Sequence, residues 1–347
     1  MSSAPEPTTD HGLDLGGAVK RAAFFVVVLA IAVALILTLP GVGEIRDRLA
    51  NATHGWIALA ALCSILSMLG FVRALWSAFD RVMAWRRALV LGFAEQGANV
   101  LLPAGGAGGP ALGAVVMTRL GVPSELAAGR HAALFLITSA VSFVAMVVFG
   151  TLTSIGVLSN GGAPLLLTLL PAVGAAIAIA LALVFALGDT PPEPHGGKLR
   201  TMFGRAHRFV HSGARTSVEL LRHGDPLLIF GATTYFAFDV AALACAFEAF
   251  GGGGPPIGAF VLAYTLGHAG AFLPTPGGVG GVEGGLIGMF VAFGAPIGLA
   301  ATAVLAYRVF QLGMPAILGA ISLLRIRHVL AHPPPREEVA ARFAGHS

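Results

Sequence analysis

The chain has 347 residues, of which 56% are hydrophobic and only 11% are charged, and its mean hydropathy is +0.83. Soluble domains carry about 25% charged residues, so this composition excludes an ordinary soluble protein and indicates a surface that faces lipid. The formal net charge is +4, but the basic residues are scattered between apolar runs. In this pattern the basic residues mark the ends of membrane spans, and they do not gather into a face that could bind nucleic acid.

Six apolar stretches along the chain are long enough to cross about 30 Å of hydrocarbon. They lie at 22–39, 56–79, 130–150, 164–187, 226–249 and 298–323. They predict an all-α polytopic membrane protein with a single transmembrane domain over residues 22–325. The polar segment 1–21 is expected to be a disordered tail, and residues 326–347 form a second tail.

Two glycine-rich breaks about 172 residues apart repeat one another between these spans. Each contains Leu-Pro followed closely by Gly-Gly-x-Gly-Gly, within repeat cores at 88–150 and 257–323. Shorter apolar pieces flank the two breaks, at 88–103, 110–122, 257–273 and 283–293. Because pieces this short are more often re-entrant than spanning, we predict two helical hairpins with the glycine loops at their tips, although hydropathy does not distinguish them from full crossings.

The charges of the connecting loops predict the orientation of the chain. Basic residues fill the loop 188–225, whereas the loops 151–163 and 251–256 carry no charge. The positive-inside rule then places both termini and the loop 188–225 in the cytoplasm. The first hairpin enters from the cytoplasm and the second from the opposite side. The repeat is therefore expected to be inverted, as in transporters whose broken helices meet near the bilayer midplane.

The glycine loops form the first candidate site. Pro110 opens the short helix after the first loop, and Glu283 lies in the first turn after the second. Free N–H groups and positive dipole ends would point from these helix starts into the protein, where a phosphate-bearing lipid headgroup would fit. The alternative is that the glycines only let helices pack closely. The candidate residues are Gly105, Gly106, Gly277, Gly278 and Gly280.

Ionisable residues at membrane depth form the second group of candidates. Each costs about 2.5–3.5 kcal/mol at a helix centre, so it must be paired, neutralised or face water. The four deepest are Glu95, Asp239, Glu283 and Arg308. Glu95 shares a helix face with Asn99 at spacing i,i+4. Arg308 requires an anion, which Asp239, Glu283 or a substrate phosphate would supply.

Two further residues near these candidates have structural explanations. Arg130 begins a span at its expected cytoplasmic end, where the positive-inside rule by itself accounts for it, and its alternative role is that of a substrate-binding residue. His268 precedes the second glycine loop and is expected to be a hydrogen-bonded packing residue. The only cysteines, Cys63 and Cys245, lie in apolar segments and predict neither a disulfide framework nor a zinc site.

The second loop and the helix after it resemble the C-terminal motif of the lysylphosphatidylglycerol synthase transmembrane (flippase-like) family. The residues that carry this resemblance are Leu273-Pro274-x-Pro276-Gly277-Gly278-x-Gly280-x-x-Glu283 and, later, Tyr307-Arg308. Asn99-x-x-Leu102-Pro103 and Arg130 resemble its N-terminal motif. The Arg and the Gly-Glu pair that family members typically have after this first proline are absent from Ala104 to Pro110.

The resemblance implies a helical bundle with re-entrant helices in the bacterial inner membrane. The best-known members of the family translocate aminoacylated phosphatidylglycerol after a fused cytoplasmic domain has attached the amino acid. This chain ends about 20 residues after its last expected helix, so we expect neither that domain nor synthase activity.

The sequence as a whole favours a flippase-like transporter of a phosphate-bearing lipid, such as a phospholipid, an aminoacyl-phosphatidylglycerol or a polyprenyl phosphate. Its expected partners are membrane lipids, and neither a cofactor nor a metal is expected. Gly-x-Ser-x-Gly is absent, which argues against a hydrolase. Two alternatives stay open: a membrane subunit or partner of a separate aminoacyl- or glycosyltransferase, and a transporter that uses Asp239 and Glu95 as proton carriers.

Overall fold

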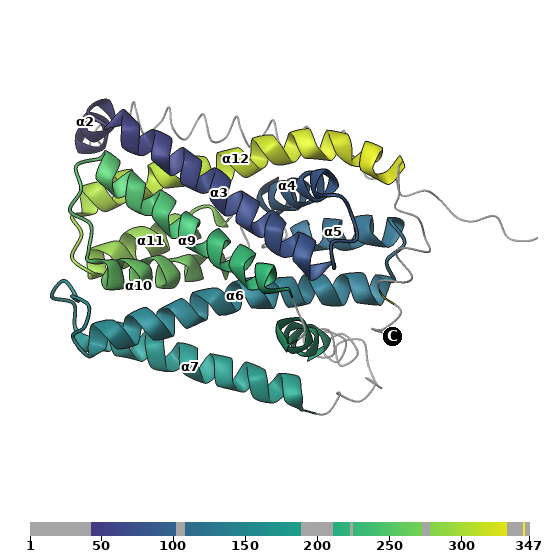
Figure 1. Ribbon diagram of the computed structural model, residues 1–347. Coiled ribbons are helices and arrows are strands. Elements are labelled where there is room, and N and C mark those ends of the chain that lie inside the picture. The colour runs from purple at the N-terminus through teal and green to yellow at the C-terminus, as the bar shows by residue number, and fades with distance from the viewer. Residues whose placement is uncertain are drawn as a thin grey trace, which may run out of the picture.

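The computed structural model describes residues 43–101, 108–188, 211–222, 225–272, 278–331 and 343. Within these residues the regular secondary structure is helical, which confirms the predicted all-α class (Figure 1). The helices are α2 (Gly43–Ala50), α3 (His54–Ala78), α4 (Trp85–Leu101), α5 (Gly108–Arg119), α6 (Ser124–Ser154), α7 (Leu165–Leu187), α9 (Pro226–Ala249), α10 (Ile257–Gly267), η1 (His268–Phe272), α11 (Gly281–Ala292) and α12 (Ile297–Ala331). Residues 211–222 are also helical.

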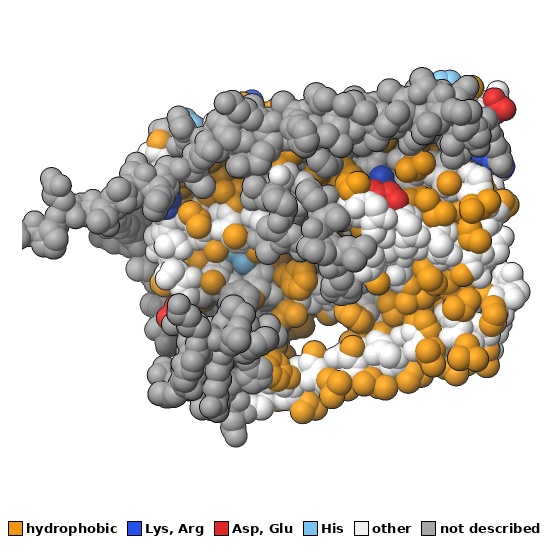
Figure 2. Space-filling model, turned by 180° about the vertical axis from the view of Figure 1, so that it is seen from behind, with side chains coloured by type: hydrophobic (Ala, Val, Ile, Leu, Met, Phe, Trp, Pro, Cys, Tyr) orange, Lys and Arg blue, Asp and Glu red, His pale blue; other side chains and the backbone are white. Residues whose placement is uncertain are grey.

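Five of the described helices are long and apolar enough to cross a membrane, namely α3, α6, α7, α9 and α12. They correspond to five of the six predicted spans, and the sixth, 22–39, lies outside the described residues. The outer helices present apolar side chains to their surroundings, and few charged side chains interrupt the described surface in Figure 2. Leu166 and Val184 on α7, for example, are each 70% exposed. Such a surface requires lipid around it, so the protein is a multi-pass membrane protein.

Four shorter helices occupy the places of the two predicted hairpins. α4 and α5 lie on either side of the first glycine loop, and α10 with η1 and α11 lie on either side of the second. The two pairs are found at opposite ends of the bundle in Figure 1. The loop residues 102–107 and 273–277 themselves lie outside the described part of the chain.

Helices α3 and α9 pack antiparallel along the middle of the bundle. The amide of Thr53, just before α3, donates to the carbonyl of Ala249 at the end of α9, over 2.9 Å. At the other end, Ser77 Oγ donates to Asp225 Oδ2 over 3.3 Å. Asp225 is also the N-cap of α9, where its side chain accepts from the amide of Leu227 and Pro226 opens the helix.

Helix packing in the two halves of the chain follows the same pattern. α4 packs on α5 and α12, and the corresponding α10 packs on α11 and α6. α5 packs on α6, as α11 packs on α12. Each short helix before a glycine loop thus packs on a long helix of the other half. Because α3 and α9 are also antiparallel, the two halves are arranged as inverted copies.

The bundle buries two large apolar clusters, each built mainly from one half of the chain and completed by helices of the other half. One cluster includes Phe79 and Leu91 of the first half, and the other includes Phe247 and Phe290 of the second. A close crossing of α4 and α12 joins the two halves: a Cβ at Gly97 would lie 2.6 Å from Cα of Gly319. These backbones therefore touch directly, and the crossing brings the end of α4 against the middle of α12.

Candidate functional site

A cavity of about 280 Å³ lies where the C-terminal end of α4 and η1 converge. Helices α3, α9, α11 and α12 supply the rest of its wall. It is unusually polar for the interior of a membrane bundle, where each polar group needs a partner. Its polar side chains include Ser64, Ser67, Gln96, Asn99, Asp239, His268, Arg308 and Gln311.

Arg308 and Glu283 form an ion pair at the cavity. Nε of Arg308 lies 2.7 Å from Oε1 of Glu283, and the two side chains are only 6% and 16% exposed. Glu283 lies in the first turn of α11, and its other oxygen, Oε2, accepts from the amide of Gly280 over 2.6 Å. Glu283 therefore caps the start of α11 and holds Arg308 at the same time. Of the anions that the sequence offers to Arg308, Glu283 is the one in direct contact.

Asp239 receives three hydrogen bonds on one oxygen, Oδ2. The donors are the hydroxyls of Tyr264 and Tyr307, the latter over 2.9 Å, and Nε2 of Gln311 over 3.2 Å. Oε1 of Gln311 in turn accepts from Nη1 of Arg308 over 2.5 Å. Gln311 thus connects the Arg308 guanidinium to the Asp239 carboxylate. No described residue donates to the other oxygen of Asp239, Oδ1.

His268 belongs to the same network. Its Nδ1 lies 2.9 Å from the carbonyl of Tyr264 and therefore carries the hydrogen, which leaves Nε2 as an acceptor for the amide group of Gln311, 3.3 Å away. The sequence does not point to Tyr264, because nothing in its spacing connects it to Asp239. Tyr307 stands beside Arg308 in the second motif, and that adjacency is the only sequence signal for it.

The second glycine loop enters α11 through two residues with left-handed backbone angles. Gly278 has φ +69° and Gly280 has φ +87°. A side chain at either position would be strained, and a Cβ at Gly278 would also lie 2.7 Å from Cγ2 of Val282. Gly278 lines the cavity. Gly105, Gly106 and Gly277 lie outside the described residues.

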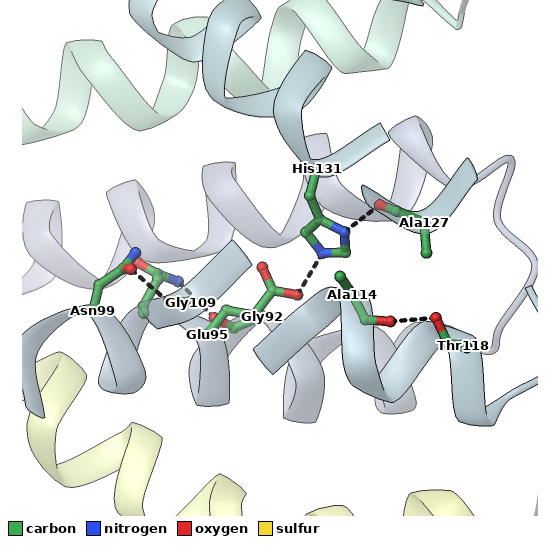
Figure 3. A network of polar contacts seen from close by, with 9 residues as sticks. Gly92, Glu95, Asn99, Gly109, Ala114, Thr118, Ala127 and His131 are labelled. Atoms are coloured by element: carbon green, nitrogen blue, oxygen red, sulfur yellow. Dashed lines mark hydrogen bonds and ion pairs between the residues drawn. The ribbon is translucent and has the colours of Figure 1, made fainter. Parts of the chain in front are cut away.

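The structure separates Glu95 from Asn99, although the two residues share a face of α4. Asn99 lines the cavity, and its Oδ1 accepts from the amide of Gly109 over 2.7 Å, so it caps the start of α5. One turn earlier, Glu95 lies under α5 and is 1% exposed (Figure 3). Its Oε1 lies 3.1 Å from Nε2 of His131 on α6. Glu95 is therefore paired away from the cavity that contains Arg308.

Arg130 also lies away from the cavity. Its Nη1 donates to the carbonyl of Ala78 over 2.7 Å and lies 2.5 Å from Oδ2 of Asp80, so it holds the turn that follows α3. At the same end of the bundle, partial burial raises the pKa of Asp225, but hydrogen bonds from Arg81 and from the amide of Leu227 outweigh it. The pKa of Asp225 therefore lies below its ordinary value.

The cavity combines one buried cation with two carboxylates and several neutral donors and acceptors. Such a set suits a ligand with both an anionic and a cationic or hydroxyl-bearing end. Among the described residues, no group of three His, Cys, Asp or Glu side chains is placed to hold a metal ion.

The fold and the site thus define a multi-pass, all-α membrane protein whose inverted halves enclose a polar cavity. The chain belongs to the family described as the lysylphosphatidylglycerol synthase TM region, whose model matches residues 23–319. This confirms the family resemblance found in the sequence. A search of curated proteins returned no match for the chain.

Proposed function

We propose that this protein is a flippase-like transporter that binds the headgroup of a phosphate-bearing lipid in the cavity at Arg308. The observation that carries the proposal is a buried guanidinium on the wall of a polar cavity inside an apolar bundle. In such surroundings, ionisable groups mark the pathway of a polar substrate more often than they serve packing. In this proposal the pairs α4–α5 and α10–α11 are re-entrant hairpins whose tips meet near the bilayer midplane.

The size of the cavity supports a headgroup as its occupant. A volume of about 280 Å³ lies just below the range for drug-sized ligand sites, about 300–1,000 Å³, and so suits a small polar group. It accommodates a glycerophosphate headgroup but not two acyl chains. The chains would then stay in the surrounding lipid while the headgroup enters between the helices.

The charges around the cavity favour a headgroup that also carries an amine. Arg308 supplies one positive charge, whereas Glu283 and Asp239 supply two carboxylates. A phosphate on Arg308 would leave Asp239 to receive a cationic group on Oδ1. Within the lipids that the sequence suggests, an aminoacyl-phosphatidylglycerol meets this requirement better than a polyprenyl phosphate does.

The Arg308–Glu283 pair provides a way to admit the phosphate. Phosphate oxygens would replace Oε1 of Glu283 on the guanidinium, in a bidentate arrangement that arginine favours. Glu283 would remain bound to the amide of Gly280 through Oε2, so the start of α11 would stay capped. After this exchange Arg308 keeps an anionic partner, whereas Glu283 keeps only the amide of Gly280, so the binding of the phosphate would have to offset the loss of the ion pair.

Transport by Arg308→Lys tests this proposal. In liposomes that contain the purified protein, wild type should move fluorescent phosphatidylglycerol and lysyl-phosphatidylglycerol between leaflets, the latter faster. Arg308→Lys retains the charge but loses the bidentate geometry, so both rates should fall by about tenfold or more at normal folded yield. Asp239→Asn should lower the rate for the lysyl lipid to that for phosphatidylglycerol.

Arg215→Lys is the matched control, because Arg215 pairs with Glu219 on the exposed face of the helix 211–222 and lies outside the cavity. Its transport rates should equal those of wild type. Equal rates in Arg308→Lys and Arg215→Lys would refute the role of Arg308. Retention of lipid by a protein that moves none would instead favour the role of partner to a separate transferase.

The orientation of the chain can be tested with single cysteines. The loop 151–163 is expected outside and the segment 188–225 in the cytoplasm, because basic residues gather in the latter. Ser159 and Ser212 are both exposed and give the two reporters. After Cys63 and Cys245 have been replaced, an impermeant maleimide added outside intact cells should label Ser159→Cys and not Ser212→Cys. Labelling of Ser212→Cys alone would overturn the orientation.

A further inference from the structure

Glu95 and His131 form a second ionisable site, separate from the cavity at Arg308. Glu95 lies on α4 and His131 on α6, 36 residues later, and the two side chains are 1% and 3% exposed (Figure 3). Oε2 of Glu95 is buried and has no hydrogen-bond partner among the described residues. The ring of Phe79 covers the imidazole at a centroid distance of 4.8 Å. Burial of an ionisable pair at this depth costs free energy, and such pairs in membrane proteins commonly have a function.

The hydrogen bonds of His131 require a proton between the two side chains. Its Nδ1 lies 2.8 Å from the carbonyl of Ala127, which only accepts, so Nδ1 carries a hydrogen. In a neutral imidazole, Nε2 is then an acceptor. An ionised Glu95 carboxylate is an acceptor as well, yet Oε1 lies 3.1 Å from Nε2. One proton must therefore be shared by the pair, on the carboxyl or on Nε2.

Helix α5 packs directly against the Glu95 and His131 side chains that share this proton. A Cβ at Gly113 would overlap both Oε1 of Glu95 and Nε2 of His131, so the backbone of α5 contacts the pair. The start of α5 is fastened to α4 by the bond between Gly109 and Asn99. With α5 in this place both side chains are buried, so a movement of α5 would expose the pair to water. Exchange of the proton and the position of α5 are consequently linked.

The second half of the chain has apolar residues at the two positions that the repeat aligns with this pair. Alignment of the repeats through Ala98 with Ala269 and through Leu126 with Leu299 places Leu266 opposite Glu95, and Val304 opposite His131. Leu266 and Val304 both pack in the apolar cluster of that half. The ionisable pair is therefore particular to the first half of the repeat.

Other charged groups on the helices around the pair have partners of their own or lie at helix ends. They are Arg73 and Arg81 with Asp225, Arg130 with Asp80, Arg308 with Glu283, Arg215 with Glu219, Asp239 with its tyrosines, Arg86 and Arg87 at the start of α4, Glu125 at the start of α6, Arg222 and Glu248 at the ends of the helix 211–222 and of α9, and Arg119 and Arg325 near the ends of α5 and α12. The charge that acts on Glu95 comes from His131. Glu95 in turn is the charge that acts on His131.

We propose that Glu95 and His131 form a proton-binding site, and that release of the proton loosens α5 from α4 and α6. With the proton bound, the two side chains attract and α5 seats on them. Without it, a carboxylate faces the lone pair of Nε2 in a site from which water is excluded, and α5 must open to admit water. The site would thereby connect the pH of the adjacent compartment to the packing of the first hairpin.

The pH dependence of thermal stability in detergent tests for the proton. Near pH 5.5, His131 is protonated in the unfolded chain as well, so the folded and unfolded states bind the same number of protons and stability does not change with pH. Above about pH 6.5 the unfolded chain releases it while the folded pair retains it, so stability falls as pH rises. Wild type should therefore lose about 2–3 °C of Tm per pH unit relative to Glu95→Gln. The amide of that variant donates to Nε2 without a bound proton.

Two further variants separate this effect from a general loss of packing. The double variant Glu95→Leu/His131→Val copies the second half, so it should fold and have the same flat profile as Glu95→Gln. Thr302→Val removes a buried hydroxyl on α12 that does not titrate, and should retain the wild-type slope. Parallel profiles for wild type and the double variant would overturn the proton site, whether or not Glu95→Gln folds.

Hydrogen exchange tests the movement of α5. After correction for intrinsic rates, amides in 108–119 should exchange faster at pH 8 than at pH 6 in wild type and at one rate in the double variant. The same rates in both proteins would refute the link to α5. Neither measurement depends on lipid transport, so a protein that moves no lipid would count against the proposed function and leave the proton site to be judged by these results.

Discussion

Arg308→Ala should lower the free energy of unfolding by about 3 kcal/mol, because it leaves the Glu283 carboxylate partly buried without its cation. Glu283→Gln by itself should also destabilise the protein, since Arg308 then loses its direct counter-ion. The double variant should recover most of the loss, because no unpaired charge remains and the glutamine still accepts from the amide of Gly280. Reversible unfolding in mixed micelles measures the three values.

The interaction energy from this double-mutant cycle separates two roles of Arg308. A coupling of about 2 kcal/mol or more would make the Arg308–Glu283 pair a support of the fold in the empty protein. A coupling near zero, with wild-type stability in Arg308→Ala, would contradict the ion pair described for the cavity. Arg308→Lys retains a cation beside Glu283 but loses the guanidinium that bonds both Glu283 and Gln311, so its stability is measured beside its transport rate to separate the two roles.

Gly97→Leu should prevent the native packing of α4 on α12. Its Cβ would lie 2.6 Å from Cα of Gly319 and 2.9 Å from the carbonyl oxygen of Pro315, and backbone atoms cannot rotate away as a side chain does. Overpacking usually costs about 1–3 kcal/mol, and a clash between two backbones belongs at or above the upper end of that range. We expect little monodisperse protein after purification and a Tm well below that of wild type.

Gly174→Leu is the control for this substitution. Gly174 lies on the exposed face of α7, and a Cβ there would meet nothing within 4 Å. An added leucine at that position faces lipid, so yield and Tm should stay close to the wild-type values. The same Tm in Gly97→Leu and Gly174→Leu would show that the crossing of α4 and α12 does not join the two halves.

The two ionisable sites differ between halves that otherwise share their helix packing. The second half carries Glu283 and Arg308 at the cavity, whereas the first half carries Glu95 and His131 beneath α5. The residues that carry the second-half site belong to the repeated glycine motif and the Tyr307-Arg308 pair. The first half lacks the charged residues typical of its motif between Ala104 and Pro110, and its ionisable pair lies elsewhere. The inverted halves therefore have different chemistry on similar scaffolds.

The sequence alone predicted the membrane class, five of the described spans and the short helices on both sides of the glycine loops. These features follow from local composition, because every crossing requires about 20 apolar residues and the two glycine-rich loops divide the apolar sequence around them into shorter pieces. The need of Arg308 for an anion was also visible, because burial of a guanidinium is costly whatever surrounds it. The sequence left three candidates for that anion.

Only the tertiary structure determines which residue pairs with each buried charge. Glu283 binds Arg308 directly, Asp239 is reached through Gln311, and Glu95 turns to His131. The spacing of residues along one helix cannot predict such pairs, since they depend on how the helices rotate and cross. Contacts between distant segments, such as the crossing of α4 and α12 at Gly97 and Gly319, set those rotations. Hydropathy is a property of each segment, whereas the site is a property of their packing.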